Sequence, residues 1–276
     1  MRTFFNTRTS VRKLLISTTR PKNPSLLNVQ DHFWRVEEFD EIDSTNTWLA
    51  EQARRGAREG LVARADYQSA GRGRLERTWE SAAGSALLCS LLLRPGLASE
   101  DLAYAVAAVA LSARGALATL SGLVPSLKWP NDLVVHDQKL GGLLAEVVAV
   151  GDELAVVVGL GINLTDHASA NPHATNLWRE SAQSFGARAV LDAVLIELDT
   201  RRDLLASSEG RTAVLAEWRA ALSTLGRRVR VIQHDAELEG VALDLDLHGG
   251  LVVDVAGERR VFTVGDVVHL RVAEGS

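Results

Sequence analysis

The segment Gly71-Arg72-Gly73-Arg74-Leu75-Glu76-Arg77 combines the residue types that bind anions. Glycines let the backbone approach a ligand and turn its N–H groups toward it, and guanidinium groups donate paired hydrogen bonds to phosphate or carboxylate oxygens. A Walker loop is excluded because no GxxxxGK[ST] occurs in the chain, and the spacing differs from the dinucleotide fingerprint. The segment therefore predicts an anion-binding loop; the alternative is a basic surface loop.

Three further segments place polar groups beside proline or glycine. They are Lys128-Trp129-Pro130-Asn131-Asp132, Lys139-Leu140-Gly141-Gly142-Leu143-Leu144-Ala145-Glu146 and Gly159-Leu160-Gly161-Ile162-Asn163. Glycine at the end of a strand lets a ligand approach the backbone, and an asparagine amide can pair with a base or another amide. Each segment taken alone also fits an ordinary turn.

The elements that must position these groups follow from hydrophobic periodicity and from turn residues. We expect strands over 35–42, 61–67, 86–93, 127–129, 132–135, 143–150 and 154–158. We expect helices from Asp43 or Ser44 to Gly56, over 99–120 with Ser99 as the cap, and over 187–206 and 211–224, with an irregular loop over 165–180. From Gly226 onward the apolar runs are short, alternating and broken by glycines, which predicts a small all-β domain built as a compact barrel.

Composition narrows the class of protein. The 276 residues are 46% hydrophobic and 24% charged, which excludes a disordered or collagenous chain. The single cysteine, Cys89, cannot form an internal disulfide and suits a reducing compartment. The most apolar stretch, 102–120, carries Arg114 and Gly115 near its middle, so we expect a buried helix and no membrane span. The histidines lack metal-ligand spacing, and no metal site is expected.

Charge is distributed unevenly along the chain. Residues 1–30 hold six basic and no acidic side chains, so the remainder carries 24 basic against 35 acidic residues. An acidic body repels a phosphate backbone, and we expect no DNA binding. The basic segment also permits a transit peptide, although a disordered tail explains it more simply.

Taken together and in order, the motifs resemble the biotin protein ligases. The resemblance covers roughly residues 36–271 and rests on Asp-Ser-Thr-Asn at 43–46, Gln68 with Ala-Gly-Arg-Gly-Arg at 70–74, Arg77 with Trp79, Lys-Trp-Pro-Asn-Asp at 128–132, Lys-Leu-Gly-Gly at 139–142, Gly-Ile-Asn at 161–163 and the closing Gly-Asp-Val-Val-His-Leu-Arg at 265–271. It implies an α+β fold, with a mixed-sheet catalytic domain of the biotin/lipoate ligase type over 31–224 and a C-terminal SH3-like β-barrel over 225–276. Residues 1–30 form the basic tail.

The resemblance also implies a reaction. Biotin is first activated by ATP, with Mg²⁺, as biotinyl-5'-AMP, and is then transferred to a lysine of a biotin carboxyl carrier protein or domain. A carboxylate and a polyphosphate repel each other, so such a site needs cations. The family pattern assigns catalysis to Lys139, Arg72, Lys128 and Asp132, with Asp132 orienting or deprotonating the lysine amine. It assigns the binding of biotin to Ser44, Thr45, Asn46, Gln68, Arg72, Gly73, Arg74, Lys139, Gly142, Leu144, Gly159 and Leu160. It assigns the binding of ATP or the adenylate to Arg74, Arg77, Trp79, Asn131 and Asn163.

Two residues depart from the family pattern, and several alternatives stay open. Glu76 stands where glycine is usual and can pair with a neighbouring arginine, and Gly141 stands where alanine is commoner.

Residues 1–35 contain Pro21 and Pro24 and show no pair of amphipathic helices, so we expect the form without an N-terminal DNA-binding domain. The alternatives are a lipoate or octanoate ligase or transferase of the same fold and a non-catalytic biotin-binding protein. We expect a cytoplasmic enzyme, and a homodimer stays open.

Overall fold

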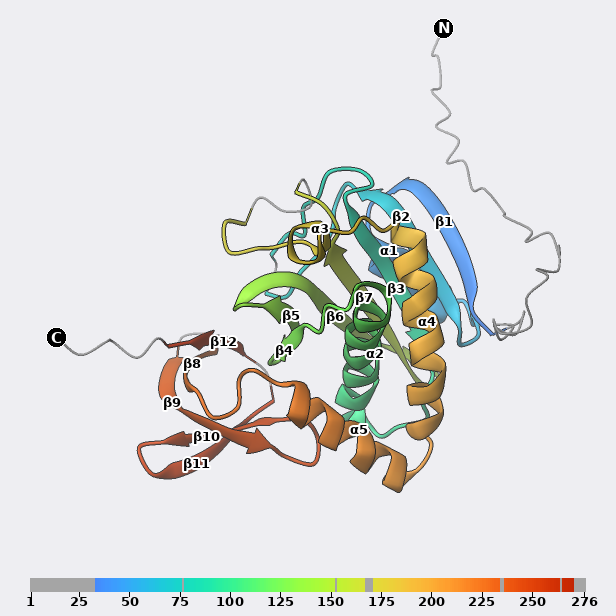
Figure 1. Cartoon of the computed structure of the whole chain (residues 1–276). Coiled ribbons are helices and arrows are strands. Elements are labelled where there is room, and N and C mark those ends of the chain that lie inside the picture. Colours follow the sequence, from blue (N-terminus) through green and yellow to red (C-terminus); the bar gives the residue numbers. More distant parts are fainter. Residues whose placement is uncertain are drawn as a thin grey trace, which may run out of the picture.

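The computed structural model describes residues 33–75, 77–151, 153–166, 171–233, 236–263 and 265–270, which form one large and one small β-sheet with helices around the large one (Figure 1). The first half contains β1 Arg35–Ile42, α1 Thr45–Arg54, β2 Leu61–Gln68, β3 Ala86–Leu93, η1 Ser99–Asp101, α2 Ala103–Ser121, β4 Ser126–Lys128, β5 Asp132–Val135 and β6 Gln138–Val150. The second half contains β7 Glu153–Asn163, α3 Leu177–Ser181, α4 Ala187–Leu204, α5 Ser208–Ala221, β8 Arg228–Gln233, β9 Ala236–Leu245, β10 Leu251–Val255, β11 Glu258–Phe262 and β12 Asp266–His269.

The larger sheet has the strand order β1-β2-β3-β7-β6-β5-β4. β1 runs parallel to β2, and every other neighbouring pair is antiparallel, which confirms the predicted mixed sheet. All eight residues of β3 are buried. This explains why its sequence is apolar at every position except Ser90, because a strand covered on both faces does not alternate.

Helices cover the two faces of this sheet. Leu91 and Leu93 of β3 lie in the core that includes α2 and α4, whereas Leu92 packs with Leu49 of α1. Since successive side chains of a strand point to opposite faces, α1 lies on one face and the α2–α4 pair on the other (Figure 1).

The apolar stretch before residue 121 is a core helix. Ser99–Ser121 is long and apolar enough to cross a membrane, but 67% of its most apolar window is buried inside the protein. The prediction that Ser99 caps one continuous helix is wrong. Ser99 opens a 3-10 turn, and α2 begins at Ala103 after Leu102, with no side-chain cap.

Several other elements differ from their predicted bounds. The helix predicted over 211–224 spans Ser208–Ala221, and the remaining differences matter because they concern the segments that carry the motifs. β6 starts at Gln138 and β7 extends to Asn163, so the glycines that were placed beside the strands lie within them. Trp129 lies outside β4 and forms a cis peptide bond with Pro130. The predicted irregular loop over 165–180 contains the short helix α3. Strand propensity alone does not reveal these extensions, because glycine disfavours strands.

The C-terminal strands form a five-stranded antiparallel sheet in the order β11-β10-β9-β8-β12. The predicted all-β domain is thus confirmed. Within the described residues, no strand pair joins β11 to β12, and barrel closure stays a prediction. The sheet is joined to the rest of the protein by hydrogen bonds, from Trp129 Nε1 to the Gly249 carbonyl (3.1 Å) and from the Tyr104 hydroxyl to the Leu247 carbonyl (2.5 Å).

A small polar cluster links the two sheets beside β4. The backbone N–H of Trp129 donates to the buried Thr224 hydroxyl (3.0 Å), and His269 Nε2 lies 3.2 Å from the same hydroxyl. Asp137 accepts from Arg227 at 2.8 Å and lies 3.7 Å from His269 Nδ1. Burial, with the nearby charges of Lys128 and Arg227, lowers the pKa of His269 from 6.5 to about 4.

This pKa gives the protein a predicted acid sensitivity. Between about pH 6.5 and 4 the unfolded chain binds a proton at His269 that the folded protein does not, so the free energy of unfolding falls as the pH drops through this window. We predict that His269→Gln makes this fall shallower in equilibrium urea denaturation. The exposed His248 provides the control, because Asp101 raises its pKa and His248→Gln should make the fall steeper. An unchanged slope in His269→Gln would contradict the assignment.

Candidate functional site

A cavity of about 360 Å³ opens on the α1 face of the large sheet, at the N-terminal end of α1. This volume lies within the range of small-molecule sites. Every candidate residue named from the sequence lines it: Ser44, Thr45, Asn46, Gln68, Arg72, Gly73, Arg74, Arg77, Trp79, Lys128, Asn131, Asp132, Lys139, Gly142, Leu144, Gly159, Leu160 and Asn163. Segments far apart in the chain are therefore brought to one place.

Glycines of two neighbouring strands form part of the cavity floor. Gly142 of β6 pairs with Gly161 of β7. A Cβ atom at Gly159 would lie 2.3 Å from Asn46 Oδ1, and one at Gly161 would lie 2.6 Å from the Trp79 ring. The missing side chains thus make room for the functional groups that stand over the floor.

One end of the cavity holds neutral hydrogen-bonding groups. Ser44 caps α1, its hydroxyl accepting from the Thr47 N–H, and this places Thr45 and Asn46 in the first turn. Gln68 Oε1 accepts from the Thr45 backbone N–H at 2.8 Å. The buried Ser90 hydroxyl lies 2.7 Å from Thr45 Oγ1 and 2.5 Å from Asn46 Oδ1. Such a set suits a neutral, polar ligand head.

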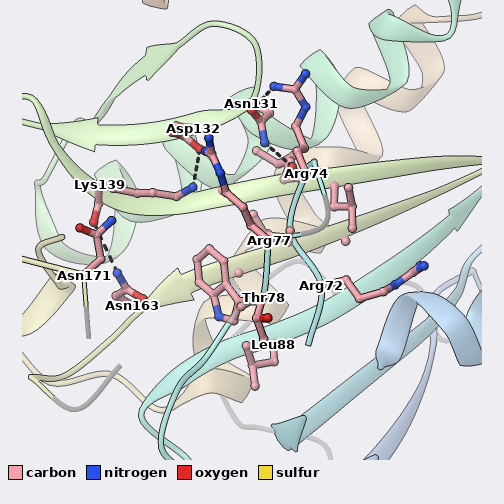
Figure 2. Close-up of a pocket in the computed structure, with 18 of the residues that line it drawn as sticks. Arg72, Arg74, Arg77, Thr78, Leu88, Asn131, Asp132, Lys139, Asn163 and Asn171 are labelled. Carbon is pink, nitrogen blue, oxygen red and sulfur yellow. Dashed lines mark hydrogen bonds and ion pairs between the residues drawn. The ribbon is translucent and has the colours of Figure 1, made fainter. Parts of the chain in front are cut away.

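The other end holds cations, and the structure pairs most of them with carboxylates. Lys139 Nζ lies 2.7 Å from Asp132 Oδ1 and 5.6 Å from the centroid of the Trp79 ring. Arg74 and Arg77 both form ion pairs with Asp266 of β12. Arg74 also donates to Asn131 Oδ1 at 3.2 Å. Figure 2 shows Lys139, Arg74 and Arg77 at this end, and Arg72 directed away from them.

Arg72 and Lys128 occupy separate positions. Arg72 forms an ion pair with Glu146 of β6, which also accepts a hydrogen bond from Asn46. Figure 2 shows Arg72 apart from Arg74 and Arg77. Lys128 lines the cavity four residues before Asp132 in the chain, and among the described residues none forms an ion pair with it. The anion-binding loop is therefore divided, with Arg74 and Arg77 at the cation end and Arg72 at the neutral end.

Two buried polar atoms on the cavity wall have no hydrogen-bond partner within the part of the chain that the structure describes. They are Trp79 Nε1, a donor, and Asn163 Oδ1, an acceptor. The Asn163 amide nitrogen donates to the Thr175 carbonyl at 3.0 Å, which fixes the oxygen on the other side. Since a buried polar atom without a partner costs free energy, these two atoms are sites where a ligand can supply hydrogen bonds.

Burial changes the pKa of two groups at the cavity. It lowers the pKa of the Arg74 guanidinium, against the opposing charges of Asp266 and Asp132. It raises the pKa of the Cys89 thiol to about 12, so this thiol is protonated at neutral pH and is a poor nucleophile.

Sequence reasoning missed three residues that organise the site. Ser90 lies in an apolar strand, Glu146 follows the recognised Lys-Leu-Gly-Gly segment, and Asp266 lies in the C-terminal domain. Ser90 stands among leucines and Glu146 stands on an apolar strand, and a polar side chain in such a place needs a hydrogen-bond partner. These positions could have indicated a role for Ser90 and Glu146 in the site. Glu76 and His167 lie outside the described residues. Within the described ranges, no three His, Cys, Asp or Glu side chains are grouped to hold a metal ion.

Comparisons with known proteins agree with this geometry. A sequence model described as the biotin/lipoate A/B protein ligase family matches residues 38–163, and one described as the biotin protein ligase C terminal domain matches 224–270. The biotin--[acetyl-CoA-carboxylase] ligase of Mycobacterium tuberculosis is 33% identical over 86% of this chain and 90% of its own length. The chain belongs to the biotin/lipoate A/B protein ligase family.

Other members of the family extend the match. The bifunctional ligase/repressor BirA of Bacillus subtilis is 28% identical over 81% of this chain and 71% of its own length. The structure of the Aquifex aeolicus biotin protein ligase, in complex with biotin and ATP, superimposes with a TM-score of 0.73 at 26% identity, covering 86% of this chain and 99% of that one. The predicted fold class and the resemblance to the biotin protein ligases are confirmed.

The glycine floor yields a prediction for the indole of Trp79. Gly161→Ala places a methyl group where the ring lies, so the ring must move, at a cost of about 1–3 kcal/mol in the free energy of unfolding. We expect the near-UV circular dichroism of the tryptophans to change. Gly186→Ala is the control, since no atom lies within 4 Å of its added Cβ. Identical spectra for Gly161→Ala and the native protein would contradict the contact.

Proposed function

We propose that this chain is an ATP-dependent ligase that activates biotin as biotinyl-5'-AMP and transfers the biotin to a lysine of a biotin carboxyl carrier protein or domain. One observation carries the proposal: a single cavity joins neutral hydrogen-bonding groups at one end to Lys139, Arg74 and Arg77 at the other. Biotin has a neutral ureido head, an apolar chain and a carboxylate, and these match the cavity in that order. The names of the relatives support the same reaction.

In the first step a carboxylate oxygen of biotin attacks the α-phosphorus of ATP, and pyrophosphate leaves. The two reactants are both anions, so the residues that lower their repulsion matter most. Lys139 is held by Asp132 and lies beside the floor glycine Gly142, where a Cβ atom would come within 3.1 Å of its ammonium group. We assign Lys139 to the carboxylate and α-phosphate and the Arg74–Arg77 pair to the phosphates. Trp79, Asn131 and Asn163 bind the adenylate.

In the second step the lysine amine of the carrier attacks the acyl carbon of the mixed anhydride, and AMP leaves. The amine must lose a proton as the amide forms. Asp132 is the cavity carboxylate closest to Lys139, at 2.7 Å. We assign it to orient the incoming amine or to accept the proton, while Lys128 adds positive charge for the departing phosphate.

Mg²⁺ accompanies ATP in this proposal. Mg²⁺ is commonly bound through one or two carboxylates together with substrate phosphates. The described residues contain no group of three side chains that could hold a metal by themselves. The ion would therefore arrive on the polyphosphate, where it neutralises charge, and no step here depends on a protein cage for it.

The alternatives share the fold but not the cavity chemistry. A lipoate or octanoate enzyme binds a head without N–H or carbonyl groups, and such a head would make no hydrogen bond to Asn46 or Gln68. A non-catalytic binding protein has no need for five lysine and arginine side chains around a cavity. The polar end and the cation end together favour the biotin ligase.

Location, partners and domain limits complete the proposal. We propose a cytoplasmic enzyme that engages a carrier protein and neither DNA nor membrane, with a homodimer as an open possibility. We place the division between catalytic and C-terminal domains at residues 224 and 225. The C-terminal family match begins at residue 224. The Thr224 hydroxyl accepts a hydrogen bond from the backbone N–H of Trp129, the residue that follows β4.

The decisive experiment mixes the purified protein with ATP, Mg²⁺, a carrier domain and either biotin or lipoate, and weighs the carrier by mass spectrometry. We expect the mass to increase by one biotinyl group. Addition of a lipoyl group in preference to biotinyl would establish the alternative enzyme, and binding of biotin without modification would establish the non-catalytic protein.

Lys139→Ala separates the two steps. Loss of one charge partner of a transition state costs about 10²- to 10³-fold in rate, and we expect adenylate synthesis to fall by at least this factor. Transfer from chemically prepared biotinyl-5'-AMP should fall distinctly less, because it bypasses the first step. Pyrophosphate release and single-turnover transfer measure the steps separately. Equal losses would mean that Lys139 only holds the ligand, and normal pyrophosphate release would remove it from catalysis.

Removal of residues 1–28 should leave ligation intact. These residues lie outside the described structure, and they precede the part of the chain that the family model matches. We expect the truncated protein to label the carrier at the native rate, and the full chain to bind no specific DNA site. A folded but inactive truncated protein, or a salt-resistant footprint on DNA, would contradict the respective statement.

A further inference from the structure

Glu146 of β6 joins two cavity residues through a single oxygen atom. Its Oε2 accepts a hydrogen bond from Asn46 Nδ2 at 2.9 Å and forms the ion pair with Arg72. Glu146 is not among the residues that line the cavity, and the sequence patterns assign it no role although it ends the segment that begins at Lys139. Its contacts place it directly behind the neutral end.

The hydrogen bonds of Asn46 can be accounted for completely on the nitrogen side. Nδ2 carries two hydrogens, and both are used, one by Glu146 and one by the Leu144 carbonyl at 3.1 Å. Both partners only accept, since a carboxylate and a carbonyl have no hydrogen to donate. The amide therefore has one orientation, with Nδ2 toward β6 and Oδ1 toward Ser90 and the glycine floor at Gly159.

We propose that Glu146 is a positioning residue that fixes the Asn46 amide with its oxygen toward the ligand, and so makes the site selective for a head that donates N–H hydrogen bonds. This inference rests on the proposed function, in which the head is the ureido ring of biotin. The Ser90 hydroxyl supplies one hydrogen bond to Oδ1 at 2.5 Å, and an oxygen with two lone pairs accepts one more. Glu146 acts through Asn46 and does not touch the reacting atoms.

The neighbouring amide has the complementary polarity. Gln68 Oε1 faces Thr45, accepting from its backbone N–H, so Nε2 is the atom left to donate. An acceptor at Asn46 and a donor at Gln68 match a head that contains both N–H and C=O. A dithiolane or alkyl head has neither group and would leave the remaining acceptor position of Asn46 and the Gln68 donor unused, which is how a buried polar site rejects such a ligand.

The test is Glu146→Gln, which keeps the shape of the side chain but adds a donor, so that the Asn46 amide can turn over. We expect the dissociation constant for biotin, measured by isothermal titration calorimetry, to rise roughly 10- to 100-fold. Lipoic acid should compete with labelled biotin for Glu146→Gln at least as well as it does for the native protein. Where no competition is detected, the highest soluble concentration of lipoic acid sets a lower limit on its inhibition constant. Glu153→Gln is the matched control, because Glu153 is 78% exposed and pairs only with Arg94 among the described residues.

A third variant separates the two partners of Glu146. Arg72 is itself assigned to biotin, so Arg72→Gln lowers biotin affinity through its own contact as well as through the lost ion pair. The double variant Arg72→Gln/Glu146→Gln should bind biotin more weakly than Arg72→Gln alone, because only the double variant frees the Asn46 amide. Equal affinities of these two variants would overturn the route through Asn46. An unchanged biotin affinity in Glu146→Gln, or a loss accompanied by an altered near-UV spectrum, would overturn the proposal itself. Failure of the native protein to bind biotin would instead overturn the proposed function.

Discussion

The antiparallel pairing of β6 with β7 determines where every group of the cavity stands. Its register places Gly142 opposite Gly161 and Leu144 opposite Gly159. Asn46 of α1 lies over Gly159, and Trp79 lies over Gly161. Since side chains alternate between faces, a slip of one residue would turn these positions toward α2 and α4. The long apolar runs of both strands prevent such a slip, because the residues between the glycines pack in the core.

Charge imposes the second constraint. A site that joins two anions must gather positive charge, yet cations close together repel one another before a ligand arrives. The structure meets this with counter-carboxylates from separate elements: Asp132 of β5 for Lys139, Asp266 of β12 for Arg74 and Arg77, and Glu146 of β6 for Arg72. The C-terminal sheet therefore takes part in the electrostatics of the cavity, although the catalytic motifs lie outside it.

Much of the fold and most of the cavity wall could be predicted from the sequence, for identifiable reasons. β1 and β3 follow the predicted bounds, because their apolar patterns and flanking turns agree. Glycine, proline and clustered cations signalled the ligand-binding segments, whereas the individual wall residues were assigned through the resemblance to the biotin protein ligases. Glu146 and Ser90 were missed because their roles depend on which strands are neighbours, and Asp266 because it reaches the cavity from another sheet. The start of α2 was missed because Ser99 is typical of a cap, whereas the chain first makes a 3-10 turn.

The ion pairs of Asp266 have a consequence for the effect of ionic strength. Arg77 is 68% exposed on its side chain, so salt screens its contact with Asp266. When the phosphates of a nucleotide bind these arginines, the ion pairs with Asp266 are replaced by ion pairs with phosphate, and salt screens both kinds of contact. Salt thus weakens the contact that is lost as well as the one that is gained, and we expect the affinity for a phosphate ligand to depend on ionic strength less steeply than the number of basic residues around the cavity indicates.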